Sequence, residues 1–255
     1  MEIKAWLKDS FSKNSIPNWT CPSCSNGLLK IKKEEFHFEE TKLSSSWHVE
    51  EDWEPEFIEY RFHGTLKCKS CDDFISFLGI GNLNHVRYYN DYPPEHVERY
   101  DEVFYPKYFH PPLNIFNISE NTPKDIKQEI TDSFRLFWND LPSCANKIRT
   151  SLEMLMNQQK VKKTFMQGGK RRNLTLHKRI EAFKISKPEI ADFLLAIKWI
   201  GNSGSHVGKL EKIDILDAYE LLEHSLNKVF DDKEDELKKK TKEINKRKGI
   251  IKRKN

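Results

Sequence analysis

The sequence predicts an α+β protein in which a β-rich module precedes an all-α bundle of about five helices. Two observations lead to this prediction. Stretches in which apolar and polar residues alternate, as is typical of strands, occur throughout residues 21–80. From residue 122 onward apolar residues recur at helical spacing instead. A chain of 255 residues is long enough for the two domains that this change of period indicates.

Four segments are expected along the chain. Residues 1–90 form the β-rich module, residues 91–122 an extended strap, residues 123–230 the helical domain and residues 231–255 a basic tail. The strap is predicted because its many prolines block regular helix, while its aromatic side chains can pack against a neighbouring surface. Within the first module, the acidic residues 34–54 are expected to form a loop or an exposed hairpin.

The helical domain is expected to begin at Thr122-Pro123, because proline is favoured at the first position of a helix. Four further helices are predicted after Pro142, over residues 174–184, between Pro188 and Gly201, and over residues 214–230. The basic residues 167–173 are interpreted as an exposed turn.

The composition is that of a soluble globular protein with a polar surface. Hydrophobic residues make up 37% of the chain and charged residues 32%, while aromatic residues at 12% supply bulky side chains for a core. No apolar run is long enough to cross a bilayer, and the amino end does not resemble a signal peptide. We therefore expect a cytoplasmic protein without a membrane partner.

The positive charge is concentrated at the carboxyl end. Residues 237–255 contain ten Lys and Arg against a single Glu, although the net charge of the whole chain is only +4. Such a segment can bind phosphates electrostatically, but lysine-rich tails that are simply solvated are also common. Both interpretations stay open.

Two Cys-x-x-Cys pairs, Cys21 with Cys24 and Cys68 with Cys71, have the spacing of a metal site. Two intervening residues allow both sulfurs of a pair to reach one ion, and two pairs complete the tetrahedral coordination that zinc prefers. A disulfide is not expected in the cytoplasm, and a redox centre needs one pair rather than two. Because four thiolates leave no position for water, we predict a structural Zn²⁺ in a zinc ribbon. Cys144 is interpreted as a small buried side chain.

Polar residues that could take part in chemistry occur on the second predicted helix and directly after the fourth. Arg149 and Glu153 are four residues apart, as are Asn202 and His206, which face the same way if the helical twist continues past Gly201. An imidazole near an arginine and a carboxylate can serve as general acid or base at a ribose hydroxyl, with the arginine neutralising a phosphate. The structural alternative is a helix cap at Asn202, a surface ion pair and a histidine without a chemical role. The residues themselves do not decide between the two.

Four stretches of the second half resemble the domain of unknown function 4145 family: SFRLFW from residue 133, SCANKIRTSLE from residue 143, LTLHKRI from residue 174, and residues 197–206. Their order and spacing agree as well as their residue types, over about residues 106–230. That family is regarded as related to the HEPN superfamily of helical bundles. Many HEPN proteins are metal-independent endoribonucleases or RNA binders in bacterial defence and toxin systems, and similar domains accompany restriction-system components.

The resemblance implies a candidate site at Arg149, Glu153, Asn202 and His206, and a homodimer in which two such sites meet. One departure concerns cleavage. Active HEPN ribonucleases usually carry an arginine immediately before the polar residue, where this sequence has a glycine, and the nearest cation on the helix is Lys198.

Three functions follow from these features. The first is an RNA-binding or RNA-cleaving defence protein, in which His206 acts as acid or base, Glu153 and Asn202 position other groups, and cations contact the RNA; these are Arg149, Lys198, Lys170, Arg171, Arg172 and Lys178. The second is an interaction module that dimerises or binds a protein of a restriction or defence system. The third is a DNA-binding accessory protein that uses the zinc ribbon and the basic tail.

Overall fold

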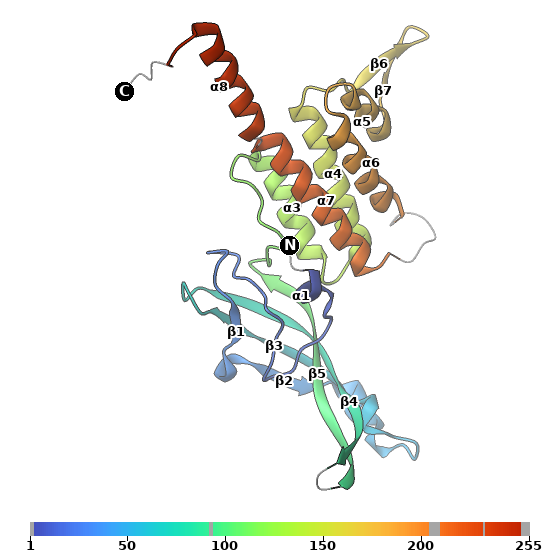
Figure 1. The fold of residues 1–255 in the computed structure, drawn as a ribbon. Helices are drawn as coiled ribbons and strands as arrows, with labels where there is room; N and C mark the ends of the chain where they lie inside the picture. Colours follow the sequence, from blue (N-terminus) through green and yellow to red (C-terminus); the bar gives the residue numbers. More distant parts are fainter. Residues whose placement is uncertain (1–2, 92–93, 204–209, 232, 251–255) are drawn as a thin grey trace.

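A computed structural model describes residues 3–91, 94–203, 210–231 and 233–250 of the chain. The protein is a mixed α/β molecule with two parts arranged end to end (Figure 1): a curled antiparallel sheet formed by the first 110 residues, and a helical region formed by the rest. This agrees with the predicted order of a β-rich part followed by a helical part.

The sheet has five strands. They are β1 (Leu29–Ile31), β2 (His37–Glu40), β3 (Glu59–Cys68), β4 (Phe74–Asp91) and β5 (Pro94–His110). All pairings are antiparallel; β1 and β2 lie along the same edge of β3, and β4 and β5 follow on its other side. A short helix, α1 (Ile3–Leu7), precedes the sheet.

The residues predicted to form an acidic loop contain several short elements. They are the 3-10 helices η1 (Lys33–Glu35) and η2 (Trp47–Val49), strand β2, and helix α2 (Lys42–Ser46); the 3-10 helix η3 (Pro55–Phe57) leads into β3. The hydroxyl of Thr41 accepts a hydrogen bond from the backbone N–H of Ser44, which caps the start of α2.

One face of the sheet is covered by aromatic side chains, and the other face is open. In β3, Phe62, Leu66 and Cys68 are buried, whereas Arg61 and His63 are exposed. On the buried face, the ring of Phe62 lies 5.4 Å from those of Phe11 and Phe104, and 5.3 Å from that of Phe77. The phenylalanines of the amino-terminal half therefore form the core of the sheet.

The predicted strap is wrong over residues 94–110, which form β5 at the edge of the sheet. The prolines are placed where a strand tolerates them. Pro94 begins the strand, and Pro106 pairs with Gly79 beside an irregularity in the register. Prolines exclude a helix but not an edge strand, so only the residues after His110 connect the two parts.

The helical region contains the five predicted helices: α3 (Lys124–Leu136), α4 (Leu141–Gln158), α5 (Leu176–Lys184), α6 (Pro188–Ser203) and α7 (Lys212–Phe230). Pro123 precedes the first helical residue as its N-cap. A sixth, α8 (Lys233–Arg247), lies within the predicted basic tail and extends beyond the other helices in Figure 1. None of the helices in the described part of the chain is both long and apolar enough to span a membrane.

The predicted basic turn is a β-hairpin. Strands β6 (Thr164–Gln167) and β7 (Lys170–Asn173) pair with each other, and only Gly168 and Gly169 form the turn. Both glycines have positive φ values, 57° and 73°, as a tight two-residue hairpin turn requires.

Aromatic side chains join the two parts. The ring of Trp19, which precedes β1, lies 5.2 Å from Phe109 of β5 and 5.5 Å from Trp138, which follows α3. The ammonium of Lys212, at the start of α7, pairs with the carboxylate of Asp9 at 2.5 Å. The sheet and the helices therefore share one continuous hydrophobic core.

Candidate functional site

The four paired cysteines meet at one end of the sheet. Cys21 and Cys24 lie in the turn before β1, Cys68 ends β3, and Cys71 lies in the turn between β3 and β4. Their sulfur atoms all lie within 4.8 Å of one another, with Cys21 Sγ 3.8 Å from Cys71 Sγ and Cys24 Sγ 3.7 Å from Cys68 Sγ. A tetrahedral ion with metal–sulfur bonds of about 2.3 Å holds its sulfurs about 3.8 Å apart. The four cysteines can therefore hold one metal ion.

The two turns that carry the cysteines have similar backbones. The residue after the second cysteine has positive φ in each pair, 57° at Ser25 and 60° at Asp72. Backbone N–H groups point at the sulfurs: that of Gly27 donates to Cys24 Sγ at 3.3 Å, and that of Ser70 donates to Cys68 Sγ at 3.3 Å. Such bonds favour the thiolate form, which is the form that binds metals.

The cluster cannot easily hold four negative charges by itself. Hydrogen bonds from the backbone N–H groups of Asn26 and Gly27 lower the pKa of Cys24 to about 6. The backbone N–H of Asp73 also lowers the pKa of Cys71, but lost hydration and the other three sulfurs outweigh it and raise that pKa to about 12. A bound metal cation reduces this conflict because its positive charge attracts all four thiolates at once.

Gly27 is a further residue of this site that the sequence interpretation missed. A Cβ atom added at Gly27 would lie 2.3 Å from Cys68 Sγ and 2.9 Å from the Cβ of Ser70. The backbone carbonyl of Gly27 also accepts a hydrogen bond of 2.8 Å from the N–H of Cys21. Only glycine allows the first turn to lie this close to the second pair of cysteines. The available signal was a glycine three residues after the second cysteine.

The fifth cysteine is not part of this cluster. Cys144 is fully buried in α4, and its sulfur lies 3.1 Å from the hydroxyl of Tyr219 on α7. Burial raises the pKa of the Cys144 thiol to about 12. The prediction of a small buried side chain is confirmed.

Polar residues of α4 and α6 meet where these two helices pack closely. A Cβ added at Gly201 of α6 would lie 3.5 Å from the Cβ of Arg149 and from the carbonyl oxygen of Ala145 on α4, an ordinary contact. This packing brings Lys198, one turn before Gly201, close enough to Arg149 for the two positive charges to interact. Asn202 is half-buried on the same turn of α6.

The predicted pair of Arg149 and Glu153 forms an exposed ion pair, with Arg149 Nη2 3.6 Å from Glu153 Oε1. His206 lies among residues 204–209, outside the described residues. The structure therefore brings together Arg149, Glu153 and Lys198, and leaves the position of His206 a prediction.

Lys198 has no anionic partner among the residues that the structure describes. Only 8% of its surface is exposed, and its Nζ lies 3.1 Å from the centre of the Trp199 ring. Burial, and next the charge of Arg149, lower the pKa of Lys198. The Nε of Arg149 is also buried, and no described residue is its hydrogen-bond partner. Two neighbouring cations of this kind favour the binding of an anion.

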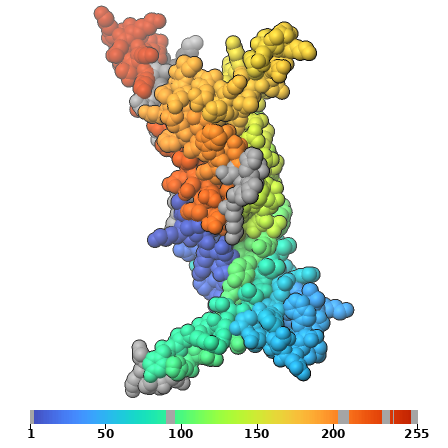
Figure 2. Space-filling model, turned by 90° about the vertical axis from the view of Figure 1, so that its right-hand side faces the viewer, coloured from blue at the N-terminus to red at the C-terminus, as the bar shows by residue number. Residues whose placement is uncertain are grey.

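A cluster of cations without carboxylates extends from the end of α4 to α5. Residues 154–180 contain eight Lys and Arg and no Asp or Glu. Seven of the eight are exposed: Lys160, Lys162, Lys163, Lys170, Arg171, Arg172 and Lys178. Figure 2 shows the β6–β7 hairpin, coloured yellow, projecting from the end of the helical region. The predicted cations Lys170, Arg171, Arg172 and Lys178 therefore lie on the surface.

The eighth cation of this stretch is structural. Arg179 is buried and donates hydrogen bonds to the carbonyl oxygens of Glu153 and Val161 and to Oδ1 of Asn157. These contacts satisfy groups at the end of α4, so Arg179 attaches α5 to that helix.

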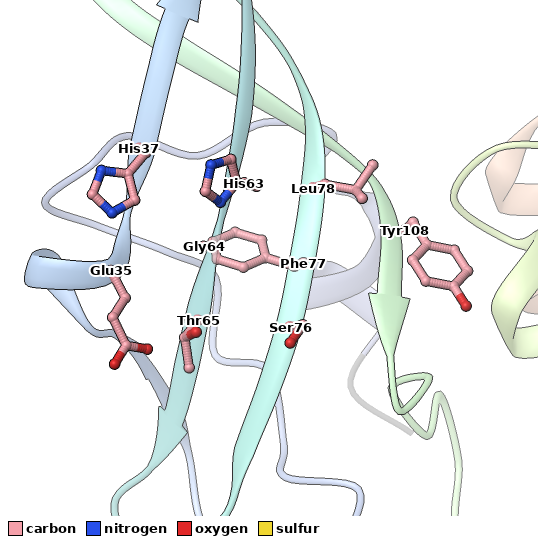
Figure 3. A pocket seen from close by; sticks show the side chains of 9 residues that line it. All are labelled: Glu35, His37, His63, Gly64, Thr65, Ser76, Phe77, Leu78 and Tyr108. Carbon is pink, nitrogen blue, oxygen red and sulfur yellow. The ribbon is translucent and has the colours of Figure 1, made fainter.

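The open face of the sheet presents a row of side chains that the sequence interpretation also missed. His37, His63, Leu78 and Tyr108 are cross-strand neighbours on β2, β3, β4 and β5 (Figure 3). They line an open hollow of about 400 Å³, in which the two imidazole rings lie 5.3 Å apart. In the described part of the chain, only the four cysteines bring three or more metal-ligating side chains together.

Two family models match this chain. Residues 9–109 match a domain of unknown function (DUF8608), and residues 131–247 match a domain of unknown function (DUF4145). No curated protein and no solved structure matches it. The resemblance to the second family is confirmed over residues 131–247. The DUF8608 match contains the sheet and the four cysteines, and the DUF4145 match contains most of the helical part.

Proposed function

We propose that this protein binds RNA through its helical region, and that its four cysteines hold a structural Zn²⁺ ion in a zinc ribbon. The RNA-binding surface, called the basic face below, consists of the exposed cations of residues 160–178 together with Arg149 and Lys198. The observation that carries the proposal is the acid-free stretch of residues 154–180, which folds beside Lys198, a buried lysine that has no anionic partner among the described residues.

Zinc is supported by the chemistry of the donors. Four thiolates at the corners of a tetrahedron suit Zn²⁺, and the sulfur separations of 3.7 and 3.8 Å fit its bond lengths. Complete coordination leaves no site for a substrate or a water, so the ion stabilises the two turns and the start of β1. One zinc per chain, measured by elemental analysis of protein purified without added metal, is the expected result.

RNA is supported by the charge and by the form of the basic face. Its cations lie on a projecting hairpin and on the adjoining helices, where they can follow a phosphate backbone. Lys198 is buried beside Arg149 and has no carboxylate partner among the described residues, so one phosphate can contact both cations there.

The binding test uses fluorescence anisotropy of a labelled 20-nucleotide RNA at increasing NaCl concentrations. Replacing Lys170, Arg171 and Arg172 together by Gln should weaken binding and reduce the salt slope by about 2, since each lost phosphate contact lowers that slope by about 0.7. Stability should not change, because all three side chains are exposed. Replacing Lys8, Lys30 and Lys33, which are exposed in the amino-terminal part, is the matched control. Equal losses in both triple variants, or no binding by the wild type, would refute the proposal.

Metal-independent cleavage of RNA is a second candidate function. It is favoured by the closeness of Lys198 and Arg149, which can stabilise negative charge on a phosphate, with Glu153 and Asn202 as positioning groups and His206 as acid or base. Cleavage in the presence of EDTA that disappears in His206→Ala would support it. Intact RNA after prolonged incubation with the wild type would refute cleavage, so that only RNA binding would remain as the proposed function.

Three further proposals come from the family resemblance. A homodimer, a role in bacterial defence with a protein partner, and DNA binding as part of a restriction-like system are each testable. Sedimentation at micromolar concentration separates a dimer from a monomer of 30.2 kDa. DNA of the same length and sequence, added to the anisotropy experiment, shows whether the ligand is RNA or either nucleic acid.

A further inference from the structure

Trp199 is the largest exposed side chain near the basic face. With 55% of its surface exposed, it follows Lys198 on α6, where Leu194 and Ile197 are buried in the core. Tryptophan is a highly buried residue type on average, and an indole with this much exposed surface offers an aromatic ring that a ligand can reach.

The indole has a cation and another aromatic ring as neighbours. The ammonium of Lys198 lies 3.1 Å from its centre, and the imidazole of His177 on α5 lies 5.8 Å away at 51°. Nδ1 of His177 is buried, and no described residue hydrogen-bonds to it. The next residue, Lys178, places its ammonium 5.5 Å from the ring of Phe165 on β6. A chain of contacts thus links the basic hairpin to the indole and to the pair of cations beyond it.

These surroundings decide which kind of ligand fits. An apolar protein surface would have to desolvate Lys198 and Arg149 without compensating their charges. A nucleotide offers a flat ring for the indole and a phosphate for the two cations. The charge of the site, together with the exposed ring, therefore favours a nucleotide over an apolar protein surface.

We propose that an unpaired nucleobase stacks on Trp199, beside His177, while the adjoining phosphate contacts Lys198 and Arg149. This inference rests on the proposed RNA binding and narrows it to single-stranded RNA. In a duplex, each base is covered on both faces by its neighbours and its edge is paired, so its ring is not accessible to an indole. Trp199 and His177 are binding residues in this scheme, separate from the electrostatic contacts of the hairpin.

The test compares the full-length protein with Trp199→Ala and Trp199→Phe. Binding of a labelled 12-nucleotide RNA and of the same RNA annealed to its complement is measured by anisotropy at several salt concentrations. The wild type should prefer the single strand. Trp199→Ala should weaken single-strand binding by roughly 5- to 150-fold, the loss of one stacked base, without changing the salt slope. Trp199→Phe should retain most of the affinity because it keeps a ring.

Two controls separate stacking from other effects. Trp47, 43% exposed in the amino-terminal part, is the matched position, and Trp47→Ala should bind like the wild type. Lys198→Gln should reduce both the affinity and the salt slope, because it removes a phosphate contact. A structural role of Trp199 would instead lower the melting temperature of Trp199→Ala and weaken binding of both RNA forms.

The outcomes distinguish this inference from the proposed function. If the wild type binds neither RNA form at low salt, RNA binding itself is wrong. If the variant with Gln at Lys170, Arg171 and Arg172 loses affinity while Trp199→Ala does not, the proposed RNA binding is supported and the stacking on Trp199 is overturned. A wild type that binds the duplex as tightly as the single strand also overturns it, as does capture of an acidic protein by the indole surface in place of RNA.

Discussion

In the four-cysteine cluster the ligands come in pairs from two short turns, whereas on the basic face the neighbouring cations Arg149 and Lys198 come from different helices. Cys21 and Cys24 share one turn, and hydrogen bonds from that same turn point at Cys24. Arg149 and Lys198 are 49 residues apart and become neighbours only because α6 packs against α4. Sites of the first kind can be recognised from spacing, and sites of the second kind depend on packing.

The two sites also have opposite electrostatic needs. The cluster gathers four thiols whose ionised forms are negative, whereas most cations of the basic face lie in a stretch without Asp or Glu. Each arrangement therefore favours a ligand of opposite charge. A metal ion bound in the cluster would be part of the fold, whereas an anion bound on the basic face could exchange.

The largest expected effect is the loss of one metal ligand. Cys68→Ser should release the ion and unfold the two cysteine turns, because metal binding contributes on the order of 10 kcal/mol to the folding of small metal domains. Elemental analysis and thermal melting followed by circular dichroism measure both effects. Cys144→Ala, which removes a buried cysteine outside the cluster, should retain the ion and cost about 1 kcal/mol. Full metal occupancy in Cys68→Ser would show that the cluster is not the site.

Two glycine substitutions compare how closely atoms pack around Gly27 in the cysteine turns and around Gly201 between α6 and α4. Gly27→Ala should damage the metal centre, because its new Cβ would overlap Cys68 Sγ; we expect a cost of about 2 to 4 kcal/mol and reduced zinc content. Gly201→Ala adds a methyl group at ordinary contact distance within a helix and should be neutral, or stabilise by up to about 1 kcal/mol. Denaturant melts of both variants test the pair. Equal effects would mean that the cysteine turns are looser than described.

The smallest expected effect on stability concerns Lys198. Lys198→Met should raise the free energy of unfolding by up to about 1 kcal/mol while weakening RNA binding, because it removes a buried charge that no carboxylate of the described residues compensates. Burial and Arg149 lower the pKa of Lys198 in the folded state. The destabilisation of the wild type by the Lys198 charge is therefore fully present below that lowered pKa and disappears as pH rises toward 10.5. The free energies of unfolding of Lys198→Met and the wild type should then converge at alkaline pH.

Lys147 provides the control of opposite sign. Its ammonium lies 2.9 Å from Glu129, and this hydrogen-bonded carboxylate raises the pKa of Lys147. The pair stabilises the fold below pH 10.5, and this contribution is lost as pH rises through the raised pKa. Lys147→Met should therefore lower the free energy of unfolding by up to about 1 kcal/mol at neutral pH, which is measured as a slightly lower melting temperature. If both Lys198→Met and Lys147→Met gained stability, the gain would come from the added apolar surface rather than from the removed charge.

Much of the architecture and the metal site could be predicted from the sequence alone, because the signals are local. Two residues between cysteines determine that both sulfurs of a pair face one ion, and Cys21, Cys24, Cys68 and Cys71 do meet. Apolar residues at helical spacing predicted α3 to α7, and buried positions such as Ile130, Phe134, Ile148 and Leu152 follow that spacing.

Tertiary structure decided the remaining features, because they depend on partners distant in the chain. Residues 94–110 form a strand only because β4 provides hydrogen bonds, which their prolines permit at an edge. The row from His37 to Tyr108 requires the register of four strands, and Trp199 is known to be exposed only once α6 has packed on α4 and α5. Spacing along a chain determines which side chains share a turn or a face, but contacts between faces are selected by packing of the whole core.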